Sequence, residues 1–141
     1  MVVVNTRRVV LGAVVGWIAW SVWSTVVNMV ILVPRYAAAQ KAGVLLTQPR
    51  YPFFVPAWFA VLLVLSFVAA WSYAGARATR GAGPATAIKV GVALGFAGGF
   101  PIVFSLAAWA PFSRFIALGW MLDLWIGAVM ATLVAGWLYR D

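Results

Sequence analysis

Residues 115–139 read FIALGWMLDLWIGAVMATLVAGWLY and contain a single charge, Asp123. An α-helix needs about 20 predominantly apolar residues to cross the hydrocarbon core of a bilayer, and this stretch is long enough. Three further apolar runs lie upstream, at about 8–33, 53–76 and 88–110. Nothing in these runs alternates in polarity as the strands of a membrane β-barrel do. The sequence therefore predicts an all-α integral membrane protein: one domain, residues 1–141, built as a bundle of four spanning helices.

The composition supports the same class. Hydrophobic residues make up 66% of the 141 residues and charged residues 9%, whereas soluble domains have roughly 45–50% and about 25%. The ten basic residues give a net charge of +8, but they lie scattered between the apolar runs. Nucleic-acid-binding proteins instead cluster Lys and Arg on a solvated face. We therefore expect membrane lipids as partners and no nucleic acid.

The inventory of reactive groups excludes most enzymatic mechanisms. The chain has no cysteine and no histidine, and its acids are Asp123 and Asp141. Zinc sites built from Cys or His, His-ligated haem and thiol chemistry are thus excluded. A pair of buried carboxylates is missing too, since Asp141 is the last residue. The sequence predicts a protein that is not an enzyme and that needs no cofactor or metal ion.

Basic residues between the runs predict the orientation in the membrane. Four helices place both termini on one side, and that side carries six basic residues against four on the other. Both termini are therefore predicted to face the cytoplasm of a bacterial-type inner membrane. The first run is too long for a cleaved signal peptide, so we expect it to be retained. The six are Arg7, Arg8, Arg77, Arg80, Lys89 and Arg140, and the four are Arg35, Lys41, Arg50 and Arg114.

The connections between the runs differ in length. Residues 111–114 form a very tight connection, and residues 77–89 are predicted to be a flexible turn. The longest connection, residues 34–52, contains the helix-forming stretch 36–42, followed by Gly43 as a candidate C-cap. We expect a short helix there at the membrane surface. Pro101 predicts a kink in the third spanning helix.

The two halves of the chain resemble each other. Residues 11–17 (LGAVVGW) match 90–96 (VGVALGF), and residues 68–73 (VAAWSY) match 134–139 (VAGWLY). Since their order is preserved, the chain is predicted to be two tandem hairpins related by an axis along the membrane normal. The alternative is chance similarity in a restricted alphabet. Each half also has a glycine strip suited to helix packing, one of them predicted to contact a second subunit of a homodimer.

Asp123 is the candidate for function, because a charge inside a membrane usually faces the bundle interior and has a partner. Trp120, Gly119 and Gly127 share its helical face, and the two glycines are expected to leave room for a helix or a ligand. In the first run one face is polar, and Asn28 on this face is a candidate partner for Asp123. That face comprises Trp17, Ser21, Ser24 and Asn28.

Three arginines stand beside aromatic residues at the boundary opposite the termini: Arg35, Arg50 and Arg114. They could converge on an anion such as a lipid phosphate or a substrate carboxylate. The alternative is three independent interfacial anchors.

Together these features predict a small membrane protein that binds or translocates a small hydrophobic or cationic molecule near Asp123. The alternative is a non-catalytic accessory or assembly subunit, or a lipid-binding scaffold, of a larger membrane complex. In architecture alone the chain resembles four-helix multidrug exporters, but their acid lies in the first helix and the first run here has none. The candidate binding residues are Asp123, Asn28, Ser24, Trp17, Trp120, Arg35, Arg50 and Arg114.

Overall fold

The computed structural model describes residues 4–139, and every regular element in that range is helical. The elements are α1 (Thr6–Val26), a π-helical turn η1 (Val27–Ile31), α2 (Val33–Lys41), α3 (Phe54–Arg80), α4 (Pro84–Trp109) and α5 (Arg114–Leu138). Four segments are long and apolar enough to cross a membrane: Thr6–Ile31, α3, α4 and α5. The predicted all-α class with four long apolar helices is confirmed. Arg140 and Asp141 lie outside the described residues.

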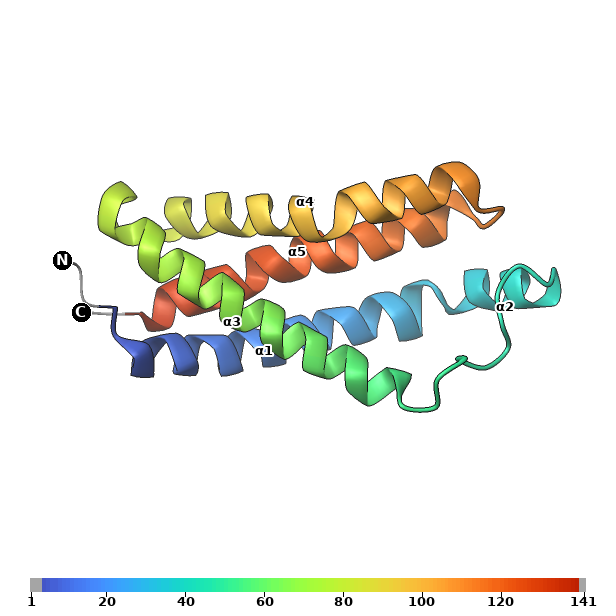
Figure 1. The fold of residues 1–141 in the computed structure, drawn as a ribbon, viewed down its shortest axis with the longest axis horizontal. Coiled ribbons are helices and arrows are strands. Elements are labelled where there is room, and N and C mark those ends of the chain that lie inside the picture. The colour runs from blue at the N-terminus through green and yellow to red at the C-terminus, as the bar shows by residue number, and fades with distance from the viewer. Residues whose placement is uncertain (1–3, 140–141) are drawn as a thin grey trace.

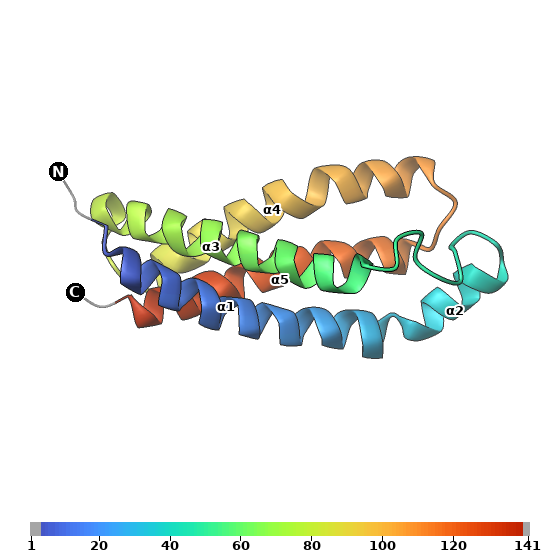
Figure 2. The ribbon, with the colours of Figure 1, turned by 60° about the horizontal axis from the view of Figure 1, so that its bottom comes forward.

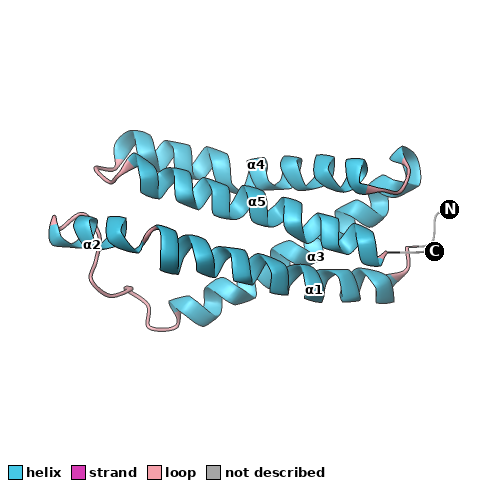
Figure 3. Ribbon diagram, turned by 180° about the vertical axis from the view of Figure 1, so that it is seen from behind, coloured by secondary structure: helices cyan, strands magenta, loops and turns pink. Residues whose placement is uncertain are grey.

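The long helices run side by side along the longest axis of the molecule, with α5 packed against α1, α3 and α4 (Figures 1 and 2). Asn5, at the start of α1, donates its N–H to the Tyr139 hydroxyl at 2.8 Å. Gly83, just before α4, donates to the Tyr73 hydroxyl at 3.1 Å. The two tyrosine rings meet edge to face, 6.5 Å apart. We call this end of the bundle the terminal end, and the opposite end, which carries α2, the α2 end (Figure 3).

Helices α1 and α5 are antiparallel and meet at every fourth residue. Small residues let the backbones approach closely: a Cβ on Gly12 would lie 3.0 Å from the Ala135 Cα, and one on Gly16 would lie 3.0 Å from the Ala131 carbonyl oxygen. This register continues along α1 and brings Ser24 to Asp123. The successive contacts are Gly12 with Ala135, Gly16 with Ala131, Trp20 with Gly127 and Ser24 with Asp123.

The glycine strip of α4 also faces α5. A Cβ on Gly95 would lie 2.6 Å from the Trp125 Cα, and a Cβ on Gly99 would lie 3.1 Å from the Leu124 Cβ. The glycines of both strips are thus in contact with α5 of the same chain. The prediction that one strip packs against a second subunit is therefore wrong, because the bundle itself fills it.

The first apolar run, predicted to be helical over 8–33, forms the helical segment Thr6–Ile31, whose last five residues are the π turn η1. Helix α1 begins two residues earlier than predicted, at Thr6, where the Asn5 side chain accepts a hydrogen bond from the Arg8 N–H at 3.2 Å. It then passes into η1, in which the Leu32 N–H reaches the Val27 carbonyl at 2.9 Å. A new helix, α2, follows, with Pro34 in its first turn, where proline needs no backbone partner.

The predicted short helix is present as α2, which covers Val33–Lys41 rather than 36–42, and its predicted cap is present too. Helix α2 ends before Gly43, whose φ of 72° is in the left-handed region that favours glycine. The Val44 N–H bonds the Ala39 carbonyl at 2.9 Å, and the Gly43 N–H bonds the Gln40 carbonyl at 3.0 Å. This pair of bonds is the Schellman motif, which satisfies the last carbonyls of the helix.

The predicted turn at 77–89 is much shorter than expected, because α3 continues to Arg80 and α4 begins at Pro84. Basic residues end an apolar run without ending a helix: Arg77 lies within α3 and donates Nη1 to the Tyr139 carbonyl at 2.9 Å. The reversal itself needs only residues 81–83, where Gly81 and Gly83 have positive φ. Helix α4 continues through Pro101 as one element.

Candidate functional site

Asp123 lies on α5 near the middle of the bundle and is 1% exposed. Its Oδ2 accepts a hydrogen bond from the Ser24 hydroxyl at 2.8 Å and another from the Asn28 side-chain amide at 2.8 Å. The carboxyl group therefore points into the protein, and the predicted contact with Asn28 is present. The four-residue register of α1 against α5 explains why Ser24 joins Asn28 on the same oxygen.

The π-helical turn η1 carries Asn28. The Asn28 amide nitrogen donates to the Ser24 carbonyl at 2.9 Å as well as to Asp123. With both bonds made from one nitrogen, the orientation of the amide is fixed and its oxygen is left as an acceptor. Short π segments inside helices often mark functional positions, because the widened turn redirects a side chain.

A chain of hydrogen bonds leads from Asn28 toward the α2 end. Its Oδ1 accepts from the Tyr36 hydroxyl at 2.6 Å, and that hydroxyl accepts from the Trp120 indole N–H at 2.6 Å. Tyr36 is half-buried, and burial raises the pKa of its phenol above the usual 10.0. The hydrogen bond from Trp120 acts in the opposite direction, whereas the charge of Asp123 raises the pKa further. The phenol therefore stays protonated and keeps donating to Asn28.

Two more indoles hold the site from other sides. The Trp58 N–H, on α3, donates to the Ser24 hydroxyl at 3.1 Å. The Trp20 N–H donates to the Asp123 backbone carbonyl at 3.2 Å, and Trp20 is 3% exposed. Side chains from α1, η1, α2, α3 and α5 thus converge around one carboxyl group.

Sequence reasoning missed Tyr36, Trp58 and Trp20 as members of this site. Tyr36 lies eight residues after Asn28, but the π turn between them breaks the helical periodicity that would have related the two. Trp58 lies near the start of the second apolar run, where tryptophans typically form an interfacial aromatic belt, so its position does not point to a contact with Ser24. For Trp20 a signal was present in the sequence: it lies four residues before Ser24 and therefore on the same face of the helix.

The space predicted beside Gly119 and Gly127 is occupied by side chains. A Cβ on Gly127 would overlap the Trp20 indole, and one on Gly119 would lie 2.7 Å from Leu32 Cδ1. Of the two alternatives for these glycines, room for another helix is confirmed and room for a ligand is wrong, because side chains of the first run fill both places. What they provide is a close fit between α5 and the first run.

Asp123 Oδ1 is buried and has no hydrogen-bond partner among residues 4–139. The hydroxyl oxygens of Ser21 and Ser66 are also buried and have no hydrogen-bond partner among the described residues. Leaving a buried acceptor without a partner costs about 1–3 kcal/mol, and more for a charged one. Oδ2 of Asp123 therefore accepts two hydrogen bonds, whereas Oδ1 accepts none from these residues.

The other predicted binding residues lie elsewhere. Trp17 donates its indole N–H to the Phe59 carbonyl at 2.9 Å, so it joins α1 to α3 rather than reaching the carboxylate. Arg35 lies 4.5 Å above the Phe115 ring, beside Arg114 in sequence. Arg50 is exposed on the connection between α2 and α3. The described contacts thus place Arg35 on an aromatic anchor and do not bring the three arginines onto a common ligand.

No family model, curated protein or solved structure matches this chain. Inference about its function therefore depends on the geometry of the site.

Proposed function

We propose that this membrane protein binds, and by changing conformation translocates, a small cationic molecule at the carboxyl group of Asp123. The observation that carries the proposal is the buried Oδ1 of Asp123, which has no partner among residues 4–139. A buried carboxyl oxygen is satisfied when it takes up a proton, or when it accepts a hydrogen bond from a buried water or from a cationic ligand. Uptake of a proton or of a cation transfers a positive charge into the bundle.

The surroundings favour a cation over a neutral hydrophobic molecule. Trp20 and Trp58 each donate a hydrogen bond at the site, so the edges of their rings are held in place. Indole faces attract cations, and this attraction is strongest away from water. A neutral apolar molecule would leave Oδ1 without a partner and gain nothing from the carboxylate.

The route to the carboxyl group is proposed to begin at the α2 end. The hydrogen bonds from Trp120 through Tyr36 and Asn28 connect the half-buried face of α2 with Asp123. The distribution of basic residues predicts that this end lies on the outer side of an inner membrane and that the terminal end faces the cytoplasm. Uptake at the α2 end therefore corresponds to the external side.

A tandem-hairpin origin is part of the same proposal. Tyr73 and Tyr139 occupy equivalent positions in the two predicted repeats, and their hydroxyls accept from Gly83 and Asn5. These two donors are the N-cap residues of α4 and α1, the first helices of the two repeats. Each repeat thus holds the start of the other by the same contact, which supports a two-fold axis along the membrane normal. Parallel repeats of this kind place binding sites at their interface.

The test is binding of a lipophilic primary ammonium ion, protonated phenethylamine, whose N–H groups can donate to Oδ1, to the purified protein in detergent, measured by equilibrium dialysis. Asp123→Asn keeps the size of the side chain and removes its charge. A hydrogen bond to a charged group contributes about 1.5–3 kcal/mol, so the affinity should fall by about 10- to 100-fold. Equal affinity in the variant would refute the proposal.

Ser66→Ala is the matched control. It removes a buried hydroxyl that has no partner among the described residues, and it leaves the hydrogen bonds of Asp123 intact. Its affinity should equal that of the wild type. If Asp123→Asn lowers the yield of folded protein while the folded fraction binds normally, Asp123 is a structural acid and the proposal fails.

A second candidate, an accessory subunit of a larger membrane complex, is favoured by a ladder of stacked rings on α4. Phe96 and Phe100 are 4.9 Å apart at 16°, and Phe100 and Phe104 are 5.4 Å apart at 7°. Phe96 and Phe104 are exposed, so the ladder offers a flat apolar face to another helix. Replacing Phe100 and Phe104 with Leu should abolish co-purification of a partner, whether a second copy or another protein. A lone monomer with the wild-type sequence would count against this role.

A further inference from the structure

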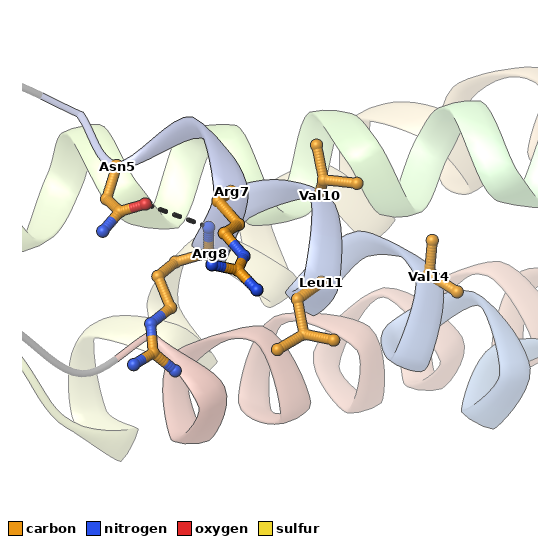
Figure 4. Close-up of a pocket in the computed structure, with 6 residues that line it drawn as sticks. All are labelled: Asn5, Arg7, Arg8, Val10, Leu11 and Val14. Atoms are coloured by element: carbon orange, nitrogen blue, oxygen red, sulfur yellow. Dashed lines mark hydrogen bonds between the residues drawn. The ribbon is translucent and has the colours of Figure 1, made fainter.

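A groove of about 790 Å³ runs along the first turns of α1, at the terminal end. It is separate from the Asp123 site: Ser24, which contacts Asp123, lies 17 residues after Arg7, roughly 25 Å further along at about 1.5 Å per residue. Figure 4 shows the two arginine side chains near the start of α1 and the three aliphatic side chains further along the helix. The lining residues are Asn5, Arg7, Arg8, Val10, Leu11 and Val14.

The groove changes from charged to apolar along the helix axis. Arg7, Val10, Leu11 and Val14 share one helical face by their spacing of three and four residues. All four are exposed, so this face is turned away from the other helices. Because the helical segment that is long and apolar enough to span begins at Thr6, we expect the arginines at headgroup depth and the aliphatic side chains at acyl-chain depth.

The charge of the groove has no counterpart in the described part of the chain. Asp123 is the one carboxylate among residues 4–139, and it is buried elsewhere. The Arg8 guanidinium has a long contact of 3.5 Å with the Leu138 carbonyl, which is neutral. Both guanidinium groups line the same groove, so an anion bound there would meet positive charge from two side chains. Guanidinium groups match phosphate oxygens with paired hydrogen bonds.

We propose that this groove is a binding site for an anionic phospholipid of the leaflet at the terminal end. Arg7 and Arg8 bind the phosphate of the headgroup, and an acyl chain lies along Val10, Leu11 and Val14. A zwitterionic lipid carries a compensating ammonium group, so it gains less from two arginines than a lipid with net negative charge. The site therefore selects phosphatidylglycerol over phosphatidylcholine.

The test uses the whole protein in nanodiscs of phosphatidylcholine that contain phosphatidylglycerol with a photoreactive acyl chain. After illumination, peptide mapping should locate the label in residues 10–14. Loss of both arginines in Arg7→Gln/Arg8→Gln should lower the affinity for phosphatidylglycerol about 10- to 100-fold, because the hydrogen bonds from guanidinium groups to the phosphate are lost. Labelling at other helices would overturn the proposal.

A matched double variant separates the groove from the general charge of this end. Arg80 and Lys89 are exposed basic residues beside the α3–α4 turn, and Arg80→Gln/Lys89→Gln removes the same charge. Its affinity should stay within about twofold of wild type, and a loss equal to that of the first double variant would overturn the site. Leu11→Trp should also lower labelling, because it fills the groove without changing the charge. Competition by inorganic phosphate at the affinity of the lipid would show a phosphate site and not a lipid site.

Discussion

Gly127→Ala tests the packing that brings Asp123 to its partners. The new methyl group would overlap the Trp20 indole, which is 3% exposed and packed with Leu62, Ala128 and Ala131. Trp20 must therefore move, and its hydrogen bond to the Asp123 carbonyl is lost. Overpacking of this kind costs about 1–3 kcal/mol, and a hydrogen bond between membrane helices contributes about 0.6–2 kcal/mol.

Gly98→Ala provides the reference for this measurement. Gly98 also lies inside a spanning helix, but a Cβ there meets nothing within 4 Å. Both substitutions gain the same helix propensity, about 1 kcal/mol, so it cancels in the comparison. Gly127→Ala should thus be less stable than Gly98→Ala by about 2–5 kcal/mol, the sum of the two losses.

The assay is the free energy of unfolding in mixed micelles, obtained by titration with a denaturing detergent and followed by circular dichroism. Trp20→Phe should recover part of the loss in the Gly127→Ala background, because the smaller ring leaves room for the methyl group. If the two alanine variants agree within about 0.5 kcal/mol, α1 and α5 do not pack in the register described, and the site built on that register is refuted.

Three further predictions concern the contacts around the site and the cap of α2. Asn28→Ala should lower the free energy of unfolding by about 1–2 kcal/mol, because the interhelical hydrogen bond to Asp123 is lost. Asn28→Asp should lower it by more, because two carboxyl groups would then meet. Equal effects of the two variants would show that Asn28 does not contact Asp123. The pKa of Tyr36 is raised above 10.0 in the folded protein, so the free energy of unfolding should fall as the pH rises beyond 10.0, because the native state then holds a proton that the unfolded state has released. The difference in tyrosinate absorbance between wild type and Tyr36→Phe should place the pKa of this phenol above 10.0. A pKa at or below 10.0 would contradict the site. Gly43→Ala should destabilise the protein by about 1–2 kcal/mol because of the positive φ alone, since a Cβ at Gly43 meets nothing within 4 Å. Gly75→Ala is the control: a Cβ there also meets nothing within 4 Å, but Gly75 lies within α3, so this variant should not destabilise the protein.

The membrane class, the four long helices and the inward position of Asp123 were predictable from sequence. Each follows from a rule that applies to single residues: apolar length decides whether a helix can span a bilayer, and a charged group in lipid turns toward the protein. The cap at Gly43 was predictable for the same reason, because left-handed backbone favours glycine wherever it occurs. Asn28 was found because one helical face relates it to Ser24.

Only the tertiary structure decided which side chains surround the carboxyl group. The π turn at Val27–Ile31 shifts everything after it by part of a turn, so helical periodicity fails to connect Tyr36 with Asn28. The glycines beside Asp123 looked like space for a ligand, but Trp20 of α1 and Leu32, which joins η1 to α2, fill it. Local sequence determines how each segment folds and which face is polar. Which neighbour contacts that face depends on the register in which α1 and α5 pack. That register is fixed only when small and large residues of these two segments, distant in sequence, fit together.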